Sequence, residues 1–196
     1  MIRTRLLPVL AVVALAAVAC GEGDTGSTAS DPAATNPSAA AHNEADIEFV
    51  QGMIPHHEQA IEMSDLALER SDNPDVADLA ERIKAAQGPE IDQMQGLLTE
   101  WGVEAGGGGH GGGHGGGGDH AGMLSDEELK ALGAAEGAEF DRLFLDGMIA
   151  HHRGAVVASE TELQEGESAE AKELAQAIID AQRAEIAEME QLLSRA

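Results

Sequence analysis

The chain aligns with itself, and this internal duplication limits its fold more than any other feature. Residues 46–98 match residues 141–193 without a gap at an offset of 95, and 20 of the 53 aligned positions are identical. Both copies contain a Gly-Met-Ile triplet and, one residue later, two adjacent His residues. Because one copy cannot bury its apolar face alone, we expect the two copies to pack against each other.

Each copy predicts two helices. Apolar residues at steps of three and four predict helices over about 44–70 and 74–100, separated by Asn73 and Pro74, which suit a cap and a first helical position. Gly166 separates the two predicted helices of the second copy, and a capping box at Ser125 predicts a short extra helix before that copy. With three Phe, one Trp and no Tyr, the core must consist of Leu, Ile, Val, Ala and Met. We predict an all-α fold, an antiparallel four-helix bundle of ferritin-like type made of two duplicated helical hairpins.

The segments outside the repeats predict export and flexible connections. Residues 1–19 resemble a signal peptide, and Cys20 stands where a bacterial lipobox places its lipidated Cys, with plain cleavage and a free thiol as the alternative. We expect an exported protein on the outer face of the cytoplasmic membrane or in the periplasm, held there by its lipid alone. The predicted parts are a disordered, lipid-anchored tether at 20–43, hairpins at 44–101 and 124–196 within one bundle domain, 44–196, and a Gly/His-rich linker at 102–123.

Composition excludes several functions. The formal net charge of −25 argues against a nucleic-acid partner, because phosphate binding needs a basic surface. A single Cys rules out a site with several thiolates. No nucleophile set, phosphate loop or dinucleotide motif is present, so we predict that the protein is not an enzyme. A metal oxidase is the weaker alternative.

Sulfur, imidazole and carboxylate groups recur together in both copies. On a helical wheel the His pair straddles the apolar stripe one turn after a Met, and Gln, Glu and Met share one face of the second helix. Packing these faces together predicts metal sites. The candidate ligands are Met53, His56, His57, Met63, Glu90 and Met94 in the first copy and Met148, His151, His152, Glu185 and Met189 in the second. The linker adds His110, His114 and His120 as an exposed candidate site, with a plain spacer as the alternative.

The donor types favour copper. Thioethers suit Cu(I), imidazole serves both Cu(I) and Cu(II), and zinc has little use for Met. A di-iron bundle needs Glu-x-x-His on inward faces, and the motif segments lack it. The alternative is a structural polar layer in which Glu90 and Glu185, or Asp46 and Asp141, satisfy the imidazoles. Pro55, where the second copy has Ala, predicts a kink and two inequivalent sites.

These motifs resemble the bacterial family called domain of unknown function 305. The resemblance rests on Phe-x-x-Gly-Met-Ile-Pro-His-His-x-x-Ala-x-x-Met from residue 49, its counterpart from residue 144, and Gln-x-x-Glu-Ile-x-x-Met after each. It implies an exported ferritin-like bundle with copper bound by Met and His, and a weaker second site because Ala158 replaces a Met. We therefore predict copper sequestration or transfer, with a copper-handling protein as partner. The alternative is a non-catalytic envelope interaction or stress module. The oligomeric state is left open.

Overall fold

The computed structural model describes residues 41–104 and 121–195, which belong to one unit of the chain, residues 36–196. This part contains helices and no strand, as the sequence predicts. The two long helices of the first copy match the predicted segments 44–70 and 74–100 closely, the break at Gly166 separates the two long helices of the second copy, and the short helix follows the predicted capping box. The helices are α1 (Glu44–Arg70), α2 (Pro74–Trp101), α3 (Asp126–Ala134), α4 (Gly137–Glu165) and α5 (Ala169–Leu193).

Local capping explains where most of these helices begin and end. Asn43 and Ser125 form capping boxes at the starts of α1 and α3, which satisfy backbone N–H groups that have no partner within the helix. Asn73 caps α2 with Pro74 in its first turn, and Ser168 caps α5. Helix α4 has no side-chain cap. Pro55, which is predicted to kink the first helix, lies inside α1, and Pro89 lies inside α2; both helices continue without a break.

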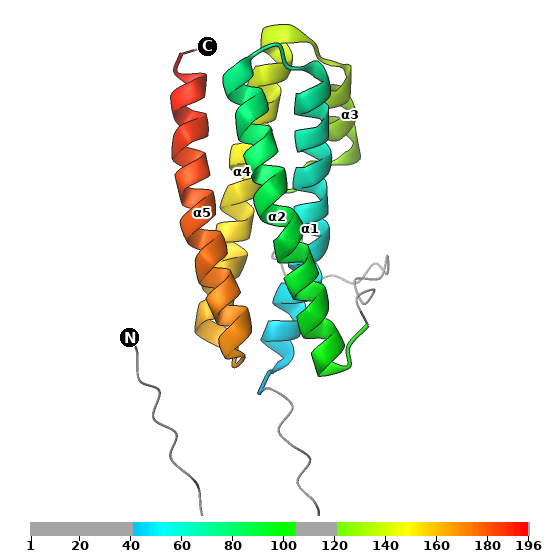
Figure 1. Ribbon diagram of the computed structural model, residues 1–196, viewed down its shortest axis with the longest axis vertical. Coiled ribbons are helices and arrows are strands. Elements are labelled where there is room, and N and C mark those ends of the chain that lie inside the picture. The colour runs from blue at the N-terminus through cyan, green and yellow to red at the C-terminus, as the bar shows by residue number, and fades with distance from the viewer. Residues whose placement is uncertain (1–40, 105–120, 196) are drawn as a thin grey trace, which may run out of the picture. The chain divides into compact units, whose positions relative to one another are not determined.

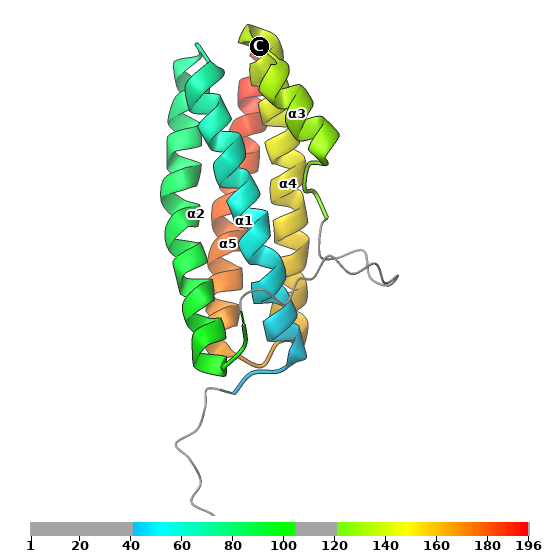
Figure 2. The ribbon, with the colours of Figure 1, turned by 90° about the vertical axis from the view of Figure 1, so that its right-hand side faces the viewer.

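The four long helices form an antiparallel bundle (Figures 1 and 2). Helix α1 packs against α2 and α4, and α5 packs against α4 and α2, so each half supplies two neighbouring helices. Helix α3 lies against α4. The two hairpins are joined by one long crossover, which is the ferritin-like connection, and the predicted fold is confirmed. None of the described helices is long and apolar enough to cross a membrane.

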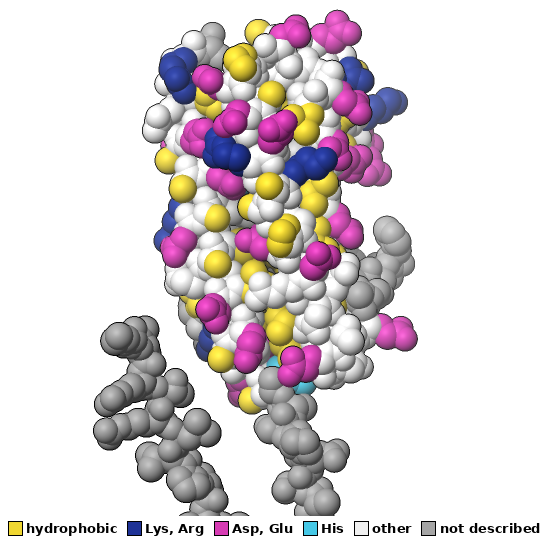
Figure 3. All heavy atoms as spheres, viewed as in Figure 1, with side chains coloured by type: hydrophobic (Ala, Val, Ile, Leu, Met, Phe, Trp, Pro, Cys, Tyr) yellow, Lys and Arg dark blue, Asp and Glu magenta, His cyan; other side chains and the backbone are white. Residues whose placement is uncertain are grey.

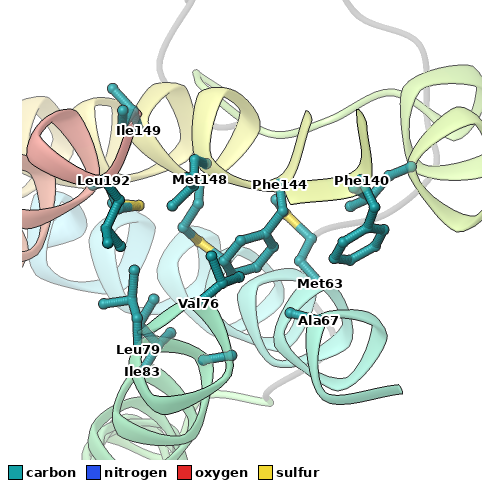
Figure 4. Close-up of a cluster of buried hydrophobic side chains, with 14 of the residues drawn as sticks. Met63, Ala67, Val76, Leu79, Ile83, Phe140, Phe144, Met148, Ile149 and Leu192 are labelled. Carbon is teal, nitrogen blue, oxygen red and sulfur yellow. The ribbon is translucent and has the colours of Figure 1, made fainter. Parts of the chain in front are cut away.

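Each of two buried apolar clusters draws side chains from both halves. One cluster contains Met63 of the first half together with Met148 and Met189 of the second, and Figure 4 shows the Phe144 ring between the Met63 and Met148 side chains. The other cluster contains Met53 and Met94, with Ala158 of the second half packed against it. The sequence grouped Met63 with Met53 and Met94 of its own copy, whereas in the structure Met63 packs with Met148 and Met189 because α4 lies against α1. The cluster around Met53 therefore contains two Met residues and the other cluster contains three.

The repeated Asp residues join the hairpins at opposite ends of the bundle. Asp46, near the start of α1, accepts hydrogen bonds from the backbone of Glu167 and Ser168 in the α4–α5 turn. Asp141, near the start of α4, accepts a hydrogen bond from the Ser71 hydroxyl in the α1–α2 turn. Each Asp thus connects the first helix of one half to the turn of the other half.

Candidate metal centre

Four imidazoles, two from α1 and two from α4, form a buried layer across the bundle. The ring centroids of His56 and His151 lie 3.7 Å apart with the ring planes tilted by 43°. The His151 and His152 centroids are 6.2 Å apart. His56 is 5% exposed, and His57, His151 and His152 are fully buried. Because α1 and α4 are neighbours in the bundle, the repeated His pairs meet at the contact between the two halves.

Carboxylates of the second hairpin helices orient two of these rings. His57 Nε2 donates to Glu90 Oε2 at 2.7 Å, and His152 Nε2 donates to Glu185 Oε2 at 2.7 Å. Because a carboxylate only accepts, each bond places a proton on Nε2 and leaves Nδ1 as the nitrogen that can bind a metal, the usual arrangement of a metal-binding His. The sequence left open whether Glu or Asp supports the imidazoles, and among the described residues Glu does so.

Several buried polar atoms next to these bonds have no hydrogen-bond partner in the part of the chain that the structure describes. They are Nδ1 of His57, Nδ1 of His152 and the side-chain amides of Gln87 and Gln182. A buried polar group without a partner costs about 1–3 kcal/mol, so a layer containing several of them is expected to hold something that satisfies them. A metal ion would take the nitrogen lone pairs, and an ordered water would suit the amides. The donor set therefore fits a metal.

Burial also keeps the central ring neutral. Desolvation lowers the pKa of His151 well below its ordinary value, and the neighbouring imidazoles of His56, His152 and His57 lower it further. A neutral ring at neutral pH is the form that binds a metal cation, because a protonated imidazole has no lone pair to donate. The layer therefore offers neutral nitrogen donors and disfavours additional protons.

Thioethers are the remaining donors near the layer. Met53 and Met148 precede the His pairs by one helical turn, and both side chains are buried, as are those of Met94 and Met189. Among the described residues, no group of three or more His, Cys, Asp or Glu side chains is placed to hold a metal. The candidates His110, His114, His120 and Cys20 lie outside the described residues, and their roles stay predictions.

The sequence missed one contact to the layer. Residues 121–124, which we call the strap, cross α1 and α4, and Ala121 O lies 3.3 Å from His56 Nε2. The strap is fixed by Gln59, whose amide donates to Leu124 O at 2.9 Å and accepts from Leu124 N at 2.8 Å. The predicted linker, 102–123, included three of these four residues. The only sequence signal was the replacement of Gln59 by Gly154 in the second copy.

Fold and site define an all-helical bundle protein with a buried layer of His–Glu pairs between two Met-containing clusters. The chain belongs to the DUF305 family, described as a domain of unknown function, whose model matches residues 46–193. This confirms the resemblance seen in the sequence. A curated relative, an uncharacterized protein of Acanthamoeba polyphaga mimivirus, is 40% identical over 55 residues, which cover 28% of this chain and 36% of the relative.

Solved structures with the same fold extend this comparison. A DUF305 fragment from Deinococcus radiodurans has 34% identity and a TM-score of 0.68, covering 79% of this chain and 98% of the fragment. A DUF305 protein from Streptomyces coelicolor, described as secreted, has 29% identity and a TM-score of 0.68 over 77% of this chain and 93% of its own. CopM in its Cu(II)-bound form has 35% identity and a TM-score of 0.64, covering 76% and 96%. CopM is also known in Cu(I)-bound and silver-bound forms.

Proposed function

We propose that this protein binds copper in its buried histidine layer and acts in copper sequestration or transfer outside the cytoplasm. The observation that carries the proposal is the pair of His–Glu bonds of 2.7 Å, which leaves Nδ1 of His57 and His152 buried without a hydrogen-bond partner. Imidazole nitrogen and the thioethers of Met53 and Met148 form a donor set suited to Cu(I). The likeness to the copper-bound forms of CopM supports the same metal.

Competition between metals tests this proposal. The full chain is exposed to equal copper, zinc and iron, desalted and analysed for bound metal, together with a variant in which His56, His57, His151 and His152 are changed to Ala. We expect the wild type to retain copper and the variant to lose most of it. His42→Ala is the matched control, because His42 stacks on Trp101 and lies outside the layer. Equal copper in the layer variant and in the control would overturn the proposal.

The alternative function is a non-catalytic envelope interaction or stress module, in which the His–Glu pairs only hold the bundle together. The bonds of Glu90 and Glu185 favour it, but it leaves the Nδ1 atoms unexplained. Thermal unfolding separates the two functions, since a ligand that binds only the native state raises its stability. Copper binding predicts a rise in Tm with Cu(I) that is absent in the four-His variant, whereas the structural role predicts no rise in either protein.

The linker and the N-terminus have separate roles in the proposed function. His110, His114 and His120 collect Cu(II), and changing all three to Ala is expected to lower Cu(II) retention without altering Cu(I) retention. Cys20 carries the lipid, so Cys20→Ser is expected to move the protein from the membrane fraction to the soluble fraction. Binding without turnover is also proposed, and oxygen-dependent oxidation of Cu(I) or Fe(II) by the purified protein would contradict it.

A further inference from the structure

The strap, residues 121–124, lies on the bundle at the height of the central His pair. Its first carbonyl, Ala121 O, accepts a hydrogen bond of 3.3 Å from His56 Nε2. Its last residue, Leu124, packs beside the Met63 cluster. Because the carbonyl only accepts, His56 Nε2 must carry the proton in this contact. The strap thus acts on His56 as Glu90 acts on His57.

Two residues at equivalent positions of the halves keep the strap in place. Gln59 forms paired hydrogen bonds of 2.9 and 2.8 Å with Leu124 O and N. At the matching position of the second half, Gly154 leaves room for the backbone, since a Cβ there would lie 1.7 Å from Ala121 O. Gly122 has φ +85° and a Cβ there would lie 2.3 Å from Ala150 O. A side chain at Gly154 or Gly122 would displace the strap from α4.

We propose that the strap is the cover of the central His pair, and that Gln59 and Gly154 are the positioning residues that seat it. In its seated position the strap fixes the ring of His56 and keeps solvent from His56 and His151. An ion held by this pair enters and leaves where the strap lifts from α1 and α4. The part of this inference that concerns copper rests on the proposed function, whereas the covering of the two rings does not.

The proposed cover can be tested in metal-free protein by measuring how accessible the His56 and His151 rings are to a reagent. Metal-free full-length protein is treated with diethyl pyrocarbonate, which acylates neutral imidazole, and the rate at each His is followed by peptide mass spectrometry. We expect Gly154→Ala and Gln59→Leu to raise the rates at His56 and His151 about tenfold, because the strap opens more often. The rates at His57 and His152 serve as internal references, since the strap makes no hydrogen bond to them.

Matched controls separate the strap from general effects of the substitutions. Gly96→Ala adds the same methyl group to a helix at a position with open space around it. Gln51→Leu removes a similar Gln whose amide donates at 3.0 Å to Glu104 O, away from the strap. Both controls are expected to show the wild-type rates at all four histidines. A purely structural strap would lower Tm in Gly154→Ala and raise the four rates equally, which would overturn the proposal.

Transfer of Cu(I) to a competing chelator then tests the path of the ion. Gly154→Ala and Gln59→Leu are expected to release Cu(I) about tenfold faster than Gly96→Ala and Gln51→Leu. If the wild-type protein binds no Cu(I) but the acylation rates of the histidines are as expected, the proposed function is contradicted. The role of the strap as a cover is then unaffected. Cu(I) release at the wild-type rate in both strap variants, with accelerated ring acylation, overturns the strap as the path of the ion. Unchanged acylation in both variants overturns the cover itself.

Discussion

The two halves hold the same histidine layer but differ in the residues around it. The His57–Glu90 and His152–Glu185 pairs have the same 2.7 Å distance, so the duplicated groups repeat the same local geometry. Three pairs among the diverged positions distinguish the surroundings of this layer, at the strap, in the apolar clusters and at the bundle end. They are Gln59 and Gly154, Met63 and Ala158, and Ala67 and Glu162. The duplicated residues thus make up the candidate site, whereas these diverged residues make the surroundings of the site different in the two halves.

The two halves also differ at the end of the bundle where α1 begins and α4 ends. Glu162, where the first half has Ala67, is 1% exposed and faces Asp46. Burial raises the pKa of Glu162 to about 8, and the hydrogen bond and charge of Asp46 raise it as well. Burial alone would raise the pKa of Asp46 too, but hydrogen bonds from the backbone of Asn43, Glu167 and Ser168 hold it below its ordinary value. At this end of the bundle a neutral carboxyl of the second half therefore lies beside a carboxylate of the first half, whereas Ala67, the counterpart of Glu162, supplies no such carboxyl.

The largest loss of stability is expected for one of two Phe residues, Phe144 and Phe49, that occupy equivalent positions in the two halves. Phe144 is fully buried and stacks with Phe140, with ring centroids 6.2 Å apart, whereas Phe49 is 7% exposed. We expect Phe144→Ala to lower the free energy of unfolding by about 4 kcal/mol and Phe49→Ala by about 2 kcal/mol, because the cavity at Phe144 is more enclosed. Urea unfolding measures both. Equal losses of unfolding free energy would show that the two apolar clusters contribute equally to stability and that the halves do not differ in the core.

The second effect concerns the unequal Met content of the clusters. Met63 is fully buried in the apolar cluster that contains Met148 and Met189, so Met63→Ala is expected to cost about 3 kcal/mol. Its counterpart Ala158 is half-buried, so Ala158→Met is expected to change stability by less than about 1 kcal/mol. Urea unfolding of both variants tests the asymmetry. A loss in Ala158→Met as large as that in Met63→Ala would mean that the Met53 cluster has no room for a third thioether.

The third effect is a pH dependence that belongs to the second half. The folded pKa of Glu162 lies above the unfolded value, so the native state keeps a proton that the unfolded chain releases. Its contribution to stability is present below about pH 4.5 and is lost as the pH rises toward 8. We expect a loss of about 2 kcal/mol over this window after allowance for solvent near the bundle end. Thermal unfolding between pH 5 and pH 9 measures the change.

Glu162→Gln isolates this effect, because the amide is neutral at every pH and has nearly the same size and shape as the carboxyl group. The variant is expected to match the wild type near pH 5 and to exceed its stability at pH 8. Glu165→Gln, which removes an exposed acid from the same helix end, corrects for the change in net charge. Parallel pH curves for Glu162→Gln and the wild type would show that Glu162 is ionised in the fold.

Local signals made the helices predictable, but long-range packing decided which residues meet. The cap at Asn73, the capping box at Ser125 and the break at Gly166 are encoded within a few residues, so the helix bounds followed from sequence. The grouping of Met63 depended on how α4 lies on α1, and no periodicity within one copy contains that information. The sequence therefore predicted the elements well and their partners across the halves less well.

The candidate site shows the same limit. The repeated His and Glu residues predicted that imidazole and carboxylate groups converge, but the sequence left open whether Glu or Asp supports the imidazoles, and the structure pairs His57 with Glu90. The strap was missed because its contacts use the backbone of Ala121 and Leu124, whose side chains carry no polar pattern. Gly154 appeared only as a difference between copies. Its meaning required the position of a segment more than 30 residues away in the chain.

The smallest effect compares the helix starts of the two halves. Asn43 accepts from Asp46 N at 3.1 Å and donates to Glu165 O at 2.8 Å, whereas Glu136 at the start of α4 makes no side-chain cap bond. Asn43→Ala is therefore expected to cost about 1 kcal/mol, and Glu136→Ala is expected to leave stability unchanged within about 0.3 kcal/mol. Chemical unfolding at pH 7 resolves this difference. If Glu136→Ala lowers stability as much as Asn43→Ala does, Glu136 stabilises α4 through its negative charge near the positive end of the helix dipole. The starts of α1 and α4 would then differ in the mechanism of their stabilisation and not in its size.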